Sequence, residues 1–416
     1  MTSGALALIA AVVFAWGAFS ARLERADLTA PMVFVGVGML LALGLPAGAG
    51  AAGVTVLTEA TLAWVLFSDA SRVGLRELRS DAGVYGRLLG LALPLTVVAG
   101  AAGAWLLLDA PLPWYALLIG AALAPTDAAL GAVVITHPAV PARIRRILNV
   151  ESGLNDGIVT PVVLVALAGA ASAHGHEEAT VVQAVLQLAG GALIGAIVGA
   201  SGGWLLRAAG RRGWTDDSFA GPAVLALALG AYAASVAAHG NGFVAAFAGG
   251  IAFGQVAGRG GPREVFYVEE TAGLASLLVW LLFGAFAVPL LYGRVDLALL
   301  LYAVLSLTAV RMVPVALSLI GTRLGARTVV FIGWFGPRGL ASVVFALLAV
   351  EELGESAAPA VAAIVLTVLL SVVAHGVSAG PGATRFGAHS PAPGAPAVGD
   401  PAAAARLRRS SGGRSS

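Results

Sequence analysis

Long apolar segments follow one another along nearly the whole chain, and they restrict what it can fold into. A helix needs about 20 apolar residues to cross the roughly 30 Å hydrocarbon core of a bilayer. Segments of this kind lie near residues 4–20, 31–49, 51–70, 84–108, 112–136, 148–171, 179–206, 219–238, 241–257, 267–291, 295–320, 328–350 and 357–380. Because 59% of the residues are hydrophobic and 11% are charged, the apolar surface exceeds what a soluble fold can bury. The sequence predicts an all-α polytopic membrane protein with about thirteen transmembrane helices.

The positions of the arginines predict the orientation of these helices. Cytoplasmic loops carry an excess of positive residues. Here alternate loops contain groups such as Arg143, Arg145 and Arg146, whereas the intervening loops contain Arg294 alone. We therefore expect a cell (plasma or inner) membrane protein with its N-terminus outside and its C-terminus in the cytoplasm.

Composition also predicts the domain organisation. Residues 1–380 are expected to form the transmembrane domain, with the first apolar segment retained as a helix. Residues 381–416 are rich in Pro, Ala, Gly, Ser and Arg, so a disordered basic cytoplasmic tail is expected. The absence of cysteine excludes disulfides and iron–sulfur clusters. No catalytic Ser/His or metal-ligand pattern is present, so we expect no enzyme activity, no cofactor and no nucleic-acid partner.

Acidic and polar residues inside the apolar segments are the candidates for function. Burying a charge in a bilayer costs about 3 kcal/mol on insertion scales, so such residues usually line an ion or proton path. One group is the heptamer Glu151–Gly157, and another is Pro125-Thr126-Asp127 one segment earlier. The alternative for the heptamer is a helix start, where acids favour the positive end of the dipole.

Helical spacing divides the heptamer into two roles. Ser152 lies three residues before Asn155 and four before Asp156, so their side chains share one face and offer oxygen ligands for an alkali cation. Glu151 points elsewhere and needs a cationic partner. The basic residues within the apolar segments are Arg311 and Arg338. We therefore expect Glu151 to form a structural ion pair with these arginines.

Two apolar segments contain signals for a broken helix. Pro125 interrupts the helical hydrogen bonds beside Thr126 and Asp127, and Gly333–Gly339 interrupts a segment in the second half. Paired interruptions of this kind indicate an inverted-repeat transporter whose site lies near the membrane midplane. We expect Asp127 to face the positive ends of the half-helices and Arg338 the negative ones.

Two other polar residues remain open on the sequence alone. Glu59 lies in the third apolar segment, where it either shapes a cavity or is simply hydrogen-bonded. His375 lies near a helix end, and a satisfied histidine is favoured there over a role in pH response.

These motifs resemble those of the monovalent cation:proton antiporter-1 family, which includes archaeal NhaP proteins and is related to the animal sodium/proton exchangers. The resemblance runs over nearly the whole apolar portion. Its Glu-x-x-x-Asn-Asp element is specific, and one departure is Pro337 where many relatives have leucine. The matching segments are Leu28–Phe34, Ala124–Asp127, Glu151–Gly157, Gly240–Phe247 and Gly336–Gly339.

The resemblance implies roles for the candidate residues. Asp156 would be the essential carboxylate that binds cation and proton, with Thr126, Ser152 and Asp127 completing the site. Glu151 would pair with Arg311, and Arg338 would be the second family arginine. It also implies a homodimer in which a core domain moves like an elevator against a dimerisation domain.

The expected activity is exchange of a monovalent cation, with Na⁺ or Li⁺ favoured, for H⁺, in the service of pH homeostasis. Asn155 precedes Asp156 where a second aspartate would add a charge, so electroneutral one-for-one exchange is expected. A K⁺/H⁺ antiporter of the same fold is the alternative. A cation channel or membrane sensor is a weaker one, since no filter motif is evident.

Overall fold

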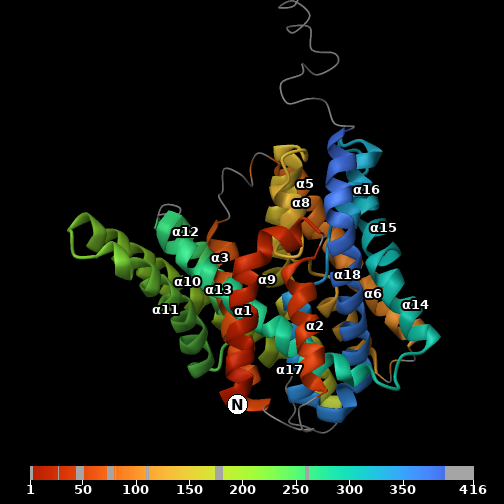
Figure 1. The fold of residues 1–416 in the computed structure, drawn as a ribbon. Helices are drawn as coiled ribbons and strands as arrows, with labels where there is room; N and C mark the ends of the chain where they lie inside the picture. Colours follow the sequence, from red (N-terminus) through yellow and green to blue (C-terminus); the bar gives the residue numbers. More distant parts are fainter. Residues whose placement is uncertain are drawn as a thin grey trace, which may run out of the picture.

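The protein is a bundle of long, broken and tilted helices in a computed structural model (Figure 1). The structure describes residues 3–26, 28–43, 51–72, 79, 81–108, 110, 112–173, 181–257 and 262–388. The α-helices are α1 (Ser3–Glu24), α2 (Ala30–Ala42), α3 (Ala51–Arg72), α5 (Ala82–Arg87), α6 (Leu93–Leu107), α7 (Pro113–Ala122), α8 (Ala132–Thr136), α9 (Ala142–Ala173), α10 (Val181–Arg211), α11 (Asp217–Ala237), α12 (Gly242–Val256), α13 (Pro262–Leu282), α14 (Leu297–Leu307), α15 (Ala309–Ser318), α16 (Ala326–Trp334), α17 (Leu340–Leu353) and α18 (Ala358–Ala388). Short π and 3₁₀ turns are η1 (Leu88–Ala92), η2 (Phe283–Ala287), η3 (Val288–Leu291) and η4 (Gly354–Ala357).

The helices pack as two groups. In the first, α3 contacts α12 and α13, α10 packs on α11 and α12, and α2 packs on α13. In the second, α6 and α9 flank α7, α15 packs on α16, and α18 packs on α14 and α17. Figure 1 shows α10 and α11 at one side of the molecule and α14, α15 and α16 at the other. Contacts of α9 and α17 with α3 join the groups.

The second group contains two sets of elements in the same order, each with a helix pair, a broken helix and a long helix. The sets are α5–α9 and α14–α18. The pairs run antiparallel, because Arg87 in α5 donates to the carbonyl of Ser318 at the end of α15, and Tyr302 in α14 donates to that of Gly100 in α6. The broken helices that follow therefore start from opposite ends of the bundle, as an inverted repeat requires.

Both predicted interruptions are present. The first separates α7 from α8, and residues 123–131 between them contain Thr126 and Asp127. The second separates α16 from α17, and residues 335–339 between them contain Arg338. At each interruption the backbone leaves the helical path, as at Phe335 with φ −81° and ψ 58°.

Two helices extend beyond their predicted boundaries. Helix α9 begins at Ala142 rather than near 148, so Glu151 lies more than two turns inside it, and the alternative of a helix start does not hold for the heptamer. Its first turns carry Arg143, which donates two hydrogen bonds to Asp81 and is stabilised there. Helix α18 continues to Ala388, so the boundary expected at 380 falls inside a helix, and the remainder of the expected tail lies outside the described residues.

By length and composition, eight helical spans among the described residues are able to cross a membrane. One of them, Leu340–Ala388, contains both α17 and α18, and shorter apolar helices such as Gly242–Val256 supplement the eight. An all-helical membrane fold is therefore present, and the number thirteen stays a prediction.

Close backbone contact joins α10 to α12. Gly195 and Gly199 of α10 lie against the backbone of Ala245 and Gly249 of α12, so a Cβ at either glycine would overlap main-chain atoms. Small residues at such positions let membrane helices pack backbone to backbone.

We expect the α10–α12 contact to be sensitive to a single methyl group. Gly195→Ala introduces a Cβ against Ala245 and should destabilise the protein by about 1–3 kcal/mol, the usual cost of overpacking. Gly190→Ala is the matched control, because the same change in the same helix meets nothing within 4 Å. Thermal unfolding in detergent measures both, and equal midpoints would contradict the packing assignment.

Candidate functional site

The two helix breaks cross each other through their main chains. The Asp127 N–H donates to the Pro337 carbonyl at 2.8 Å. Proline lacks an N–H but keeps its carbonyl, so Pro337 supports this contact despite its departure from the family pattern. A Cβ on Gly336 would lie 2.7 Å from Arg311 Nε, and one on Gly339 would overlap the Asp127 carboxylate. The glycines thus allow the breaks to approach.

Asp127 and Arg338 cap opposite half-helices. The Asp127 carboxylate accepts the Leu340 N–H at the start of α17 (2.7 Å) and the N–H groups of Ala129 and Leu130. The Arg338 guanidinium is fully buried and donates to the carbonyls of Ala124 (2.8 Å) and Pro125 (3.2 Å) beyond the end of α7. Each side chain therefore lies at a helix end where the helix dipole favours its charge.

A buried polar triad joins α9 to the first break. The Asn155 amide donates to Thr126 Oγ1 (2.7 Å), and the hydroxyls of Thr126 and Ser152 are 2.9 Å apart. Their exposed fractions are 0%, 2% and 6% for Asn155, Thr126 and Ser152. Asn155 Oδ1 is buried and has no hydrogen-bond partner within the described ranges. The triad therefore presents buried oxygen atoms, the ligand type that hard cations take in proteins.

Asp156 is the acid that follows the triad residue Asn155 on α9. It is half-buried, and among the described residues its carboxylate has no hydrogen bond or ion pair. Two other carboxylates, Asp127 and Asp69, lie within electrostatic range and repel its negative charge. Since an unpaired buried charge is costly, this carboxylate favours binding a cation or a proton.

Glu151 and Arg311 form a buried ion pair on the other face of α9. Arg311 Nη2 lies 2.5 Å from Glu151 Oε1, and the side chains are 1% and 3% exposed. Arg338, the other predicted member, is not in this pair, because carbonyl groups hold its guanidinium. The pair therefore binds α9 to α15.

The structure separates Glu59 from the site and brings in Asp69. Both lie on α3, ten residues apart, which is about 15 Å along a helix. Glu59 contacts Tyr232 of α11, whereas Asp69 lies against α9, where its Cβ would be 3.5 Å from a Cβ added to Gly153. Sequence reasoning missed Asp69 because it ends an apolar segment beside Arg72 and resembles an interfacial acid.

The Gly240–Phe247 segment, which matches the family pattern, packs beside the site. Asn241 caps α12 by accepting the Val244 N–H at 2.9 Å, and the ring of Phe247 in the same helix fills the space over Gly157. The segment therefore packs against α9 one residue beyond Asp156.

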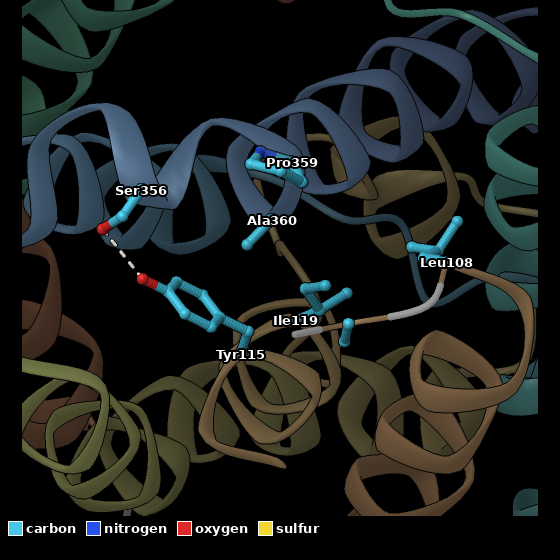
Figure 2. Close-up of a pocket in the computed structure, with 7 residues that line it drawn as sticks. Leu108, Tyr115, Ile119, Ser356, Pro359 and Ala360 are labelled. Atoms are coloured by element: carbon cyan, nitrogen blue, oxygen red, sulfur yellow. Dashed lines mark hydrogen bonds between the residues drawn. The ribbon is translucent and has the colours of Figure 1, made fainter. Parts of the chain in front are cut away.

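A small pocket at the opposite end of α7 is separate from this site (Figure 2). Its lining includes Tyr115, whose hydroxyl donates to Ser356 at 2.8 Å, and apolar side chains such as Ile119 and Pro359. The lining residues that the structure describes carry no charge.

Comparison with known proteins identifies the family. The family model described as sodium/hydrogen exchanger, transmembrane, matches residues 7–384. The chain belongs to this family. The K(+)/H(+) antiporter NhaP of Alkalimonas amylolytica is 28% identical over 238 residues, which are 56% of this chain and 40% of that protein. The chain thus matches two fifths of that relative's length.

The solved structures show the same fold. The sodium proton antiporter MjNhaP1 of Methanocaldococcus jannaschii at pH 8 aligns with a TM-score of 0.73 at 18% identity, covering 92% of this chain and 98% of that one. An electron-microscopy structure of the same antiporter also gives 0.73, at 17% identity. The predicted inverted-repeat antiporter fold is confirmed.

Loss of the buried ion pair should destabilise the protein strongly. Glu151→Gln or Arg311→Gln leaves one buried charge unpaired, which costs about 3–5 kcal/mol, and the double variant should lose less than the sum. Thermal unfolding midpoints of the four proteins measure this coupling.

The Arg72–Glu269 pair between α3 and α13 supplies the control cycle. Both of its side chains are 41% exposed, so its coupling should be only about 0–1 kcal/mol. A Glu151–Arg311 coupling no larger than this would contradict the structural role.

Proposed function

We propose that this protein is a secondary transporter that exchanges a monovalent cation, with Na⁺ or Li⁺ favoured, for H⁺. Membership of the sodium/hydrogen exchanger family supports cation/proton antiport. The observation that carries the proposal is Asp156, a half-buried carboxylate beside the Thr126–Ser152–Asn155 triad that has no counter-charge in the described part of the chain. Cation and proton compete for this carboxylate, so binding of one releases the other.

The charges around Asp156 favour electroneutral one-for-one exchange. Asp127 is held by three backbone N–H groups, and Glu151 is neutralised by Arg311. Asn155 contributes a neutral amide where a second carboxylate would add a charge. One carboxylate therefore carries either one cation or one proton.

Exchange also requires that the site open to each side in turn. We propose that the group containing α5–α9 and α14–α18 carries the site and moves against the group containing α3 and α10–α13, in a homodimer. The triad, both breaks and the Glu151–Arg311 pair all belong to the group that contains α5–α9 and α14–α18, which supports its moving as one body. The arginine distribution supports an outside N-terminus and a cytoplasmic C-terminus in the cell membrane.

A K⁺/H⁺ antiporter is the second candidate, because the relative from Alkalimonas amylolytica is named as one. The oxygen ligands of the triad suit Na⁺, Li⁺ and K⁺ alike in chemical type. The same carboxylate competition would operate with either ion.

Asp156→Asn should abolish exchange. The amide keeps the shape of the side chain but neither carries the negative charge nor releases a proton in the assay range. Proteoliposomes with an internal pH-sensitive dye measure the exchange after a cation pulse. Full exchange by this variant would remove Asp156 as the carrier.

Asp216→Asn is the matched control for that experiment. Hydrogen bonds from the side chain and backbone of Ser218 lower the pKa of Asp216 from its usual value, so this substitution also removes one negative charge. Asp216 is an exposed N-cap of α11, and asparagine is an equally good cap. Its exchange should equal that of the wild type.

Electroneutral competition makes two further measurements decisive. The exchange rate should not respond to an imposed membrane potential, and the apparent KM for the cation should rise as pH falls, since protons occupy more of the Asp156 carboxylates. A panel of Na⁺, Li⁺, K⁺ and Rb⁺ identifies the substrate. A rate that follows the potential would contradict one-for-one exchange, and K⁺ giving the lowest KM would favour the second candidate.

A further inference from the structure

Helix α18 contacts both sides of the second break through two buried side chains that the cation site does not use. Ser371 and His375 are four residues apart and share one face of α18, and they are 0% and 2% exposed. His375 Nε2 lies 2.9 Å from the carbonyl of Trp334, the last residue of α16. The N–H of Arg338, two residues before α17, donates to Ser371 Oγ at 2.7 Å.

The identities of the donors and acceptors fix most of this network. A carbonyl only accepts, so His375 Nε2 carries a hydrogen and donates it to Trp334. Ser371 Oγ accepts from Arg338, which leaves its own hydrogen free for His375 Nδ1 at 3.2 Å. In the doubly protonated ring, Nδ1 would instead donate to the Ser371 carbonyl at 3.0 Å. The contacts to Trp334 and Arg338 are the same in both forms.

These contacts satisfy backbone groups that the break leaves without helical partners. The end of α16 has free carbonyls and the approach to α17 has free N–H groups, and each such group is costly inside a membrane protein. The Trp334 carbonyl accepts the Gly336 N–H at 2.8 Å, and His375 is its second donor. Ser371 accepts the Arg338 N–H, so α18 bridges the break. The Trp334 and His375 rings also stack, with centroids 5.0 Å apart.

The bridge leads directly to the cation site. The backbone of Arg338 is held by Ser371, and its guanidinium holds the carbonyls of Ala124 and Pro125. Thr126, the residue that receives the Asn155 amide and contacts Ser152, follows immediately. Arg338 therefore connects the α18 contacts to the chain segment that contains Thr126.

We propose that Ser371 and His375 form a clamp that holds the second helix break in the shape required for cation binding, which makes them positioning residues. The inference rests on the proposed function of the crossing as a cation site. Loss of the clamp leaves Asp156 and the triad side chains present but frees Arg338 to shift. Cation affinity should therefore fall while the exchange chemistry persists.

The test uses the full chain in two measurements. Proteoliposomes give the KM and maximal rate of cation exchange at fixed pH, and thermal unfolding in detergent gives the stabilisation by added NaCl, LiCl or KCl. Ser371→Ala and His375→Leu should each raise KM about five- to tenfold, the effect of one lost hydrogen bond to a buried group. The stabilisation by the cation should fall in parallel, with less change in maximal rate.

Conservative and control variants separate the clamp from simple packing. His375→Gln keeps an amide donor within reach of the Trp334 carbonyl, so its KM should stay within about twofold of wild type. Ser378→Ala is the matched control, because Ser378 contacts the same Trp334 through the indole N–H (3.0 Å) and not through the carbonyl. Its KM should be unchanged.

Three results would overturn the clamp: wild-type KM in Ser371→Ala and His375→Leu, equal impairment by glutamine and leucine at position 375, or an effect of Ser378→Ala as large as that of Ser371→Ala. If His375→Leu does not fold, Ser371→Ala and His375→Gln decide the matter. A wild-type protein stabilised by cations but unable to exchange them for protons would contradict the proposed function instead. In that case the loss of cation stabilisation in the variants still tests the clamp.

Discussion

The reciprocal capping of two half-helices by Asp127 and Arg338 is the interaction on which the rest of the site depends. Breaking two helices in the middle of a membrane protein exposes N–H and carbonyl groups that have no water to bind. Asp127 accepts the Leu340 N–H of α17, and Arg338 donates to the carbonyls beyond α7. Because carbonyl groups hold Arg338, Glu151 takes Arg311 as its partner. Asp156 is left without an ion pair among the residues that the structure describes. The distribution of roles follows from this capping.

Sequence patterns predicted the parts of this arrangement that depend on residue type. Proline and clustered glycines mark the two breaks, and the shortage of buried bases left Arg311 among the few partners open to Glu151. Helical spacing placed Ser152, Asn155 and Asp156 on one face, and in the structure the first two contact Thr126 of the first break. The roles assigned to Asp156 and Asp127 in cation binding stay predictions, although the main-chain contacts of Asp127 favour a capping role.

Other features were beyond sequence reasoning for physical reasons. The start of α9 was placed too late because Arg143 and its neighbours look like a loop, whereas Asp81, far away in the sequence, neutralises Arg143. Asp69 was overlooked because its position relative to α9 depends on how two groups of helices pack. Asp69 belongs to the group that contains α3 and lies within electrostatic range of Asp156. Movement of the two groups relative to each other would change the distance between Asp69 and Asp156 and leave the triad intact.

The crossing of the breaks is held largely by main-chain atoms, with a proline carbonyl as acceptor and two glycines giving the space. Glycines are the main sign of such contacts in a sequence. Many different residues at the neighbouring positions are compatible with them. Residue identity is thus a poor measure of how far this architecture has been retained. Because main-chain atoms hold the crossing, two chains that are only 18% identical share this fold with a TM-score of 0.73. Relatives that have diverged further in sequence should be sought by the geometry of the crossing.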